Sequence, residues 1–243
     1  MSVTRWVLLS IAALLIALLA RMPAAWVVER AAPSLRGVQL ENIEGTVWRG
    51  RADVTLTQAG LTLKDIRWRF QPAGLLALQW RYGIESSDVA LAGRASVGLG
   101  FGSVTLTDGE LALPARTAGA LVPMLSAFSP EGNVIANIRT LQCKGERCTG
   151  DVKATWNGAA LSLAELRPLG DYQIDAVLND GRADFDVKTL KGTLRAAGKG
   201  QFANGALRFT GELSAPPDQM PRVQGLMRLL GTPDERGVLR INR

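Results

Sequence analysis

Apolar and polar residues alternate along most of the sequence beyond residue 30. In the segment LENIEGTVWRGRADVTL, residues 40–56, small and apolar side chains fall on one side of an extended chain and charged side chains on the other. A period of two is typical of a half-buried β-strand, so we expect this segment to form one strand. The other segments expected to form strands are GLTLKDIRWRF, LALQWRYGIES, DVALAGRASVGLG, SVTLTDGELAL, GNVIANIRTLQC, CTGDVKATWNG, GDYQIDAVLND, GRADFDVKTL, KGTLRAAGKGQF and GALRFTGELSA.

Two similar stretches divide these strands into two series. DGELALPA at 108–115 returns as TGELSAPP at 210–217, an offset of about 100 residues, which indicates an internal repeat. A short helical pattern with an apolar stripe follows each stretch, and such helices would cover part of the sheet. The stripes are Leu121, Met124, Leu125 and Phe128 in the first helix, and Val223, Leu226, Met227 and Leu230 in the second.

The N-terminal residues depart from the alternation. An uncharged apolar run extends from Trp6 to Ala20 and continues beyond Arg21 to Val28, and about 20 such residues can cross a bilayer. We therefore predict a cytoplasmic N-terminus over residues 1–5 and a transmembrane anchor over 6–28, because Arg5 favours the cytoplasmic side. A cleaved signal peptide is the alternative, and both interpretations export the rest of the chain.

The expected fold class is therefore mainly β. It consists of an N-terminal transmembrane helix followed by a periplasmic domain of two similar antiparallel β-meander units, each closed by a short helix. The first unit would cover residues 29–130 and the second residues 131–243.

Composition argues against most enzyme classes. The 243 residues include no histidine, which excludes Ser-His-Asp catalysis, Cys-His catalysis and the usual zinc sites. The net charge of +6 is spread along the chain without a basic run, so nucleic acid is not an expected partner. We expect no catalytic residue, metal, cofactor or small-molecule substrate.

The two cysteines, Cys143 and Cys148, flank a polar turn in LQCKGERCTG. In an oxidising compartment this spacing predicts a structural disulfide that closes a hairpin. A metal site would need further ligands, and a redox pair would normally have C-x-x-C spacing.

Two further groups of residues are candidates for a structural and a binding role. Gly45, Thr46, Trp48 and Gly50 form a compact motif in which we expect Trp48 to be a core anchor and the glycines to allow bends or close approach; partner contact is the alternative. Arg49, Arg51, Arg67 and Arg69 would form an outward cationic stripe if their strands pair. This stripe could meet acidic residues of a partner or lipid headgroups, or be an ordinary solvated face.

Several segments in order resemble one known family. They are PAAWVVERAAPSLRGVQLENIEGTVWRG, WRFQPAGLL, LPA, LGDYQIDA and LLGTPDERGVLRI, which span nearly the whole chain. In this order they resemble protein N of the bacterial type II secretion system. EGTVWRG stands where the family has Ser-Gly-Thr-Leu-Trp, and PSLRGV carries two extra residues before its glycine.

The resemblance implies a non-enzymatic, single-pass subunit of the bacterial inner membrane with its bulk in the periplasm. Its partners would be the membrane and other inner-membrane or periplasmic subunits of the secretion system. A membrane-anchored lipid-handling protein with an apolar β groove is the alternative, and an open groove would leave apolar strand positions without a covering helix. A hydrolase is disfavoured because the chain lacks G-x-S-x-G and S-x-x-K motifs.

Overall fold

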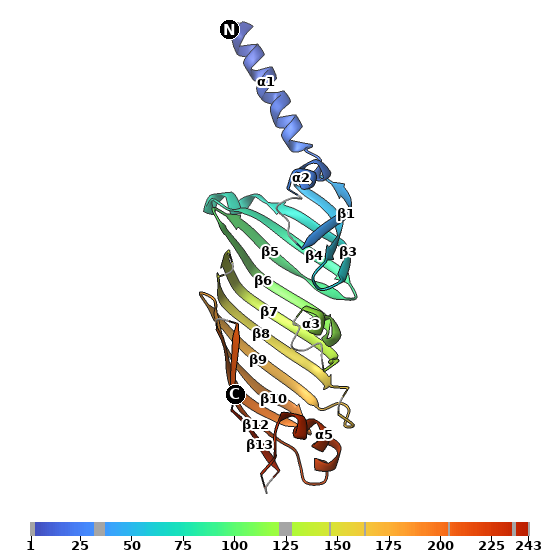
Figure 1. Ribbon diagram of the computed structural model, residues 1–243. Helices are drawn as coiled ribbons and strands as arrows, with labels where there is room; N and C mark the ends of the chain where they lie inside the picture. The colour runs from blue at the N-terminus through green and yellow to red at the C-terminus, as the bar shows by residue number, and fades with distance from the viewer. Residues whose placement is uncertain are drawn as a thin grey trace.

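The computed structural model describes residues 3–31, 37–121, 128–145, 147–162, 164–203, 205–234 and 237–242. Thirteen strands form one antiparallel sheet, in which every strand is hydrogen-bonded to its neighbours in sequence. Figure 1 shows the strands stacked one after another along the length of the molecule. Their bounds are β1 (Val38–Gly45), β2 (Arg49–Leu56), β3 (Leu61–Gln71), β4 (Trp80–Asp88), β5 (Leu91–Gly100), β6 (Ser103–Pro114), β7 (Glu131–Lys144), β8 (Arg147–Ala160), β9 (Gly170–Asn179), β10 (Arg182–Gly192), β11 (Arg195–Ala203), β12 (Ala206–Ser214) and β13 (Val238–Asn242).

The helices are distributed along this sheet. Helix α1 projects away from the sheet, α2 lies beside β1, and α3 and α5 lie beside the middle and the far end of the sheet (Figure 1). Their bounds are α1 (Val3–Ala20), α2 (Ala24–Ala31), the 3-10 helix η2 (Pro72–Ala77), α3 (Ala115–Leu121) and α5 (Met220–Leu230).

The apolar segment over residues 6–28 is divided between two helices. Helix α1 ends at Ala20, and α2 begins at Ala24. Pro23, which has no backbone N–H to continue a helix, instead forms a β-bridge with Thr46. Within the described part of the chain, no helix combines the length and the hydropathy needed to cross a bilayer. The anchor over 6–28 therefore stays a prediction.

The segment 40–56 forms two strands, so the prediction of a single strand was wrong. Gly45 has a φ of +92°, and the backbone N–H of Thr46 donates to the carbonyl of Arg49 over 2.9 Å, which closes a tight turn. After this turn β2 folds back antiparallel onto β1, and Gly45 faces Gly50 across the pair. The alternation continues through the turn, and for this reason it did not indicate the reversal.

The sheet has one apolar and one polar face. Residues that face each other across paired strands lie on the same side, and one such line crosses ten strands from β3 to β12. We call this line the apolar row: Phe70, Tyr82, Val97, Leu106, Leu141, Gly150, Leu178, Ala183, Phe202 and Leu207. The adjacent line on the opposite side is the polar row: Arg69, Gly83, Ser96, Thr107, Thr140, Asp151, Val177, Asp184, Gln201 and Arg208.

The sheet continues across the boundary expected between residues 130 and 131. Strands β6 and β7 pair from Val104 to Pro114, and Leu113 faces Val134. The strands therefore form one sheet, and the division into two meander units is not visible in the hydrogen bonding. Helices α3 and α5 do follow β6 and β12, the strands that contain the two similar stretches. Met124 and Leu125 of the expected first helix lie outside the described residues.

The main hydrophobic core lies under α5. Val223, Leu226 and Met227 of this helix are almost completely inaccessible to solvent and pack with Leu239 of β13. Tyr172 of β9 belongs to the same core; its hydroxyl donates to the carbonyl of Leu194 over 2.8 Å, and burial raises its pKa. Val223, Leu226 and Met227 of the apolar stripe predicted for the second helix thus close the far end of the sheet, and the side chain of Leu230 lies outside the described residues.

Two hairpins, β7–β8 and β9–β10, form where the sequence predicted them. The structure contains the disulfide between Cys143 and Cys148, which face each other at the ends of β7 and β8. Asp180 and Gly181 both have positive φ between β9 and β10, as the two central residues of a type I′ turn require. The C-terminal strand β13, in contrast, was not indicated by the alternation.

Replacement of Met227 by alanine tests the importance of this core. The Met227 side chain is 0% exposed, so Met227→Ala should lower the free energy of unfolding by about 2–5 kcal/mol through the cavity it leaves. The matched control is Gln224→Ala on the exposed side of α5, which should change it by less than about 0.5 kcal/mol. Urea unfolding of the full chain measures both, and equal effects would contradict this location of the core.

Candidate functional site

The four arginines predicted to form a stripe lie together on the polar face. Arg49 and Arg51 of β2 face Arg69 and Arg67 of β3 across the paired strands, and all four side chains are exposed. We call these four residues the arginine surface. An open groove of about 530 Å³ runs over it, and its lining also includes Glu44, Glu85 and Gln71.

Acidic neighbours compensate half of this positive charge. The guanidinium of Arg51 donates two hydrogen bonds to Glu44, at 2.9 and 2.7 Å, and that of Arg67 pairs with Asp65 at 2.5 Å. Each carboxylate raises the pKa of the arginine that it binds. Arg49 and Arg69 have no ion pair among the described residues, so their charges remain available to another molecule.

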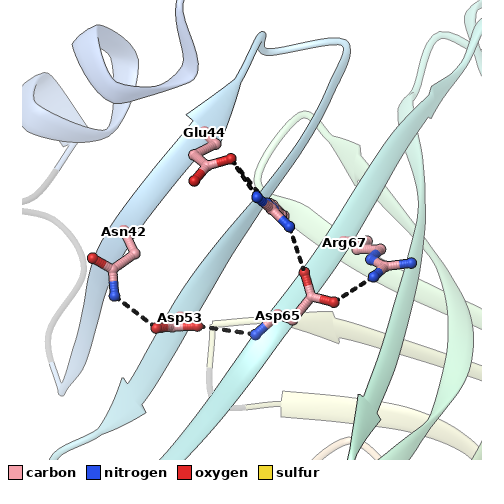
Figure 2. A network of polar contacts seen from close by, with 6 residues as sticks. Asn42, Glu44, Asp53, Asp65 and Arg67 are labelled. Atoms are coloured by element: carbon pink, nitrogen blue, oxygen red, sulfur yellow. Dashed lines mark hydrogen bonds and ion pairs between the residues drawn. The ribbon is translucent and has the colours of Figure 1, made fainter.

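A carboxylate network supports the arginine surface from one side (Figure 2). Asp53 of β2 accepts a hydrogen bond from the side-chain amide of Asn42 at 2.8 Å and one from the backbone N–H of Asp65 at 2.9 Å. Asn42 and Asp65 both have positive φ and lie where the registers of β1 and β3 shift against β2. The two hydrogen bonds, that from Asn42 first, lower the pKa of Asp53.

The glycine motif makes room for an aromatic ring. A Cβ atom on Gly50 would lie 2.4 Å from the ring of Trp68 and 2.4 Å from the carbonyl oxygen of Glu44, closer than side chains approach. The Trp68 indole N–H donates to the carbonyl of Thr46 over 3.1 Å. Gly45 and Gly50 thus let the first hairpin close over Trp68.

Trp48 joins the hairpin to the N-terminal helix and is not a core anchor. Its side chain is half-buried, and its indole N–H donates to the carbonyl of Leu19 in α1 over 2.7 Å. Its ring packs against Phe70 and Trp80, with centroid distances of 5.0 and 6.2 Å. Trp48 lies in the turn between β1 and β2, directly before Arg49.

Sequence reasoning missed this contact between the turn and the helix end. Beside the Trp48 bond, the backbone N–H of Val47 donates to the carbonyl of Met22 over 3.1 Å. Trp48 was visible in the sequence as a candidate packing residue, but only the unrecognised turn at 46–48 brings it to the end of α1.

The arrangement is suited to binding anionic groups. Exposed guanidinium groups on paired strands can each donate to carboxylate or phosphate oxygens. Within the described residues, no group of three or more His, Cys, Asp or Glu side chains is placed to hold a metal ion.

Comparisons with known proteins point to one family. The family model described as "Type II secretion system (T2SS), protein N" matches residues 36–242. A Vibrio cholerae serotype O1 protein named type II secretion system protein N is 28% identical over 169 residues, which cover 68% of this chain and 65%, slightly less than two thirds, of that relative. Proteins of the same name from Pectobacterium carotovorum subsp. carotovorum and Aeromonas hydrophila are 26% and 27% identical, and the alignments cover 87% and 90% of this chain and 85% and 89% of the relatives. No solved structure matches the chain significantly.

The Asn42–Asp53 bond makes a prediction about pH. Because the folded pKa of Asp53 is lowered, its contribution to stability should be complete above its ordinary value of 3.8 and be lost as pH falls through the folded value. Asn42→Gly removes the amide but still permits the positive φ, so the pKa of Asp53 should rise towards 3.8. Titration of the Asp53 carboxyl by NMR measures this shift, and an unchanged pKa would rule out the Asn42 bond as its main cause.

The Trp48 contact makes a second prediction. Trp48→Phe keeps a ring beside Phe70 but removes the indole N–H, whereas Trp48→Ala removes both. Backbone amide exchange at Val47, which bonds to Met22, should therefore increase in the order wild type, Trp48→Phe, Trp48→Ala. Trp48→Ala should also cost about 1–3 kcal/mol, less than the loss of a fully buried tryptophan. Unchanged exchange at Val47 in the alanine variant would show that Trp48 does not hold the helix end.

Proposed function

Because the chain belongs to the family of type II secretion system protein N, we propose that it is a non-enzymatic, bitopic accessory subunit of the inner membrane in that secretion system. It supports the assembly or stability of the export machine through protein–protein contacts. The observation that carries this proposal is the arginine surface, an exposed cationic site that is held by structural ion pairs and contains no catalytic arrangement.

The N-terminal segment is the proposed membrane anchor. Helix α1 has 18 residues and large apolar side chains exposed along its length, such as Ile16 with 68% exposure. A helix of this length spans about 27 Å, and a bilayer can thin to accept a span slightly shorter than its hydrocarbon core. Arg21 directly after α1 can extend towards headgroups, and Trp48 and Trp80 lie near the same end, where aromatic residues favour the interface. The sheet is then periplasmic.

The arginine surface is the proposed contact site for another inner-membrane or periplasmic subunit. Arg49 and Arg69 lack ion pairs among the described residues and face an open groove, so an acidic segment could bind there without displacing a structural contact. The turn that precedes Arg49 is bonded to the end of α1, which would keep this surface close to the membrane. A partner in the same membrane would therefore reach this surface by diffusion within the membrane plane.

Charge reversal tests the contact. In Arg49→Glu/Arg69→Glu the two uncompensated charges change sign, while the Arg51 and Arg67 ion pairs stay intact. Folding should be nearly unaffected because exposed charges contribute little to stability, but recovery of other secretion subunits with the full chain should fall about tenfold or more. Co-purification at matched expression measures this loss.

The matched control is Arg195→Glu/Arg208→Glu, which reverses two exposed arginines at the far end of the sheet. Its recovery of partners should equal that of the wild type. Equal recovery by all three proteins would exclude the arginine surface as the contact site, and equal loss in both variants would indicate a general charge effect.

A further inference from the structure

The apolar row crosses ten strands without a cover. None of its ten residues is buried, and the last two, Phe202 and Leu207, are 41% and 39% exposed. The buried residues of the core under α5 are, in contrast, 0–6% exposed. An apolar line of this length on one sheet face marks a binding surface, because isolated proteins rarely leave contiguous apolar patches in water.

The helices cover only one end of the strands. Helix α3 follows the end of β6 at Pro114 and α5 follows the end of β12 at Ser214, whereas Leu106 and Leu207 of the apolar row lie near the starts of these two strands. Figure 1 shows α3 and α5 beside the same long side of the sheet. On the opposite side, the β5–β6 turn carries Phe101, which is 98% exposed.

The apolar face deepens beneath the helices. A cavity of about 290 Å³ lies between α3, α5 and the strands, and its lining is formed by apolar side chains that include Val134, Trp156, Ile174 and Leu226. Val134 and Ile174 point to the same sheet face as the apolar row, since both face residues of that side across β6 to β10. Helices thus cover the apolar face along one side, above this cavity, and leave it uncovered along the other, where the apolar row lies. We call the cavity and the apolar row together the trough.

The beginning of the trough is continuous with the apolar surface of α1. Phe70, the first residue of the apolar row, packs against Trp48, and Trp48 is bonded to Leu19 at the end of α1. Neighbouring side chains of that helix, such as Leu18 with 62% exposure, are apolar and outward. The apolar row contains no charged residue, so the apolar surface continues from the end of α1 along the sheet.

We propose that this trough binds the acyl chains of membrane lipids, which enter from the bilayer beside α1. The proposal rests on the insertion of α1 in a membrane, as in the proposed function, but not on contacts with secretion subunits. Ten strands at a spacing of about 4.8 Å give the row a length of about 43 Å, more than the roughly 30 Å hydrocarbon core of a bilayer. The trough is long enough to shield whole acyl chains, and headgroups would remain at its open side.

Site-specific photo-crosslinking tests the occupant. Benzoylphenylalanine is placed in the full chain at Leu106 or Leu178 of the apolar row, in cells whose phospholipids carry radioactive phosphate. The matched controls are Thr107 and Val177, the neighbouring positions on the polar face; Val177 is apolar and 52% exposed. Radioactive lipid should be attached at Leu106 and Leu178 but not at the two controls.

A charge in the trough provides a second test. Val97→Glu, next to Leu106 in the apolar row, should reduce the lipid adduct at Leu106 by about tenfold or more, because a carboxylate is unfavourable among acyl chains. Ser96→Glu, the adjacent residue on the polar face, should leave it unchanged. If Val97→Glu does not fold, the comparison of Leu106 with Thr107 decides alone.

Three results would overturn the proposal: adducts to another protein only, adducts between two copies of this chain only, or equal lipid labelling on both faces. In cells that lack the other secretion subunits the lipid adducts should persist. Lost partner recovery with retained adducts would contradict the proposed function alone. A chain that carbonate removes from the membrane would contradict both proposals, because both rest on the insertion of α1. Retained partner recovery without lipid adducts would contradict the trough alone.

Discussion

Every feature of this molecule depends on the register of neighbouring strands. A shift by one residue between two strands would exchange the apolar and polar faces of one of them. Each strand pair therefore has to place apolar residues opposite apolar residues and polar residues opposite polar residues. Irregularities are present, for example between Ala52 and Val54 of β2, and the structure accommodates them with bulges. Asp53 accepts hydrogen bonds from residues at two of these irregular places and so links the irregular positions of β1 and β3 through β2.

The consistent register gives the two faces different chemistry. The polar face carries the arginine surface and its acidic partners, and is suited to contact with a protein. The apolar face has its main core under α5, and single residues elsewhere, such as Ala52 and Leu113, are also buried, whereas the apolar row is not. The turn around Trp48 is bonded to the end of α1, so one contact would orient both the proposed protein-binding surface and the proposed lipid-binding surface with respect to the helix.

Much of the fold could be predicted from local alternation, and the failures have physical causes. Most of the strands and the Asp180–Gly181 turn follow from local rules, whereas the pairing of β2 with β3, on which the arginine stripe depended, was a condition that the structure fulfils. The turn at 46–48 was missed because Gly45 alone, with a positive φ, reverses a chain whose alternation is uninterrupted. The half-buried state of Trp48 and the open trough depend on which helices reach which strand ends. That is a tertiary property, which no local pattern contains.

The sequential order of the strands also determines how disturbances spread. Because each strand pairs only with the preceding and following strands, the sheet resembles a linear array in which stability is a sum of nearest-neighbour terms. Such an array can add one hairpin at a time as a chain emerges from a translocation channel, since no strand has to wait for a distant partner. Its terminal strand β1 can open while the interior stays paired, whereas β13 is held by Leu239 in the core under α5. Exchange of β1 with a neighbouring molecule is then possible without unfolding of the whole sheet.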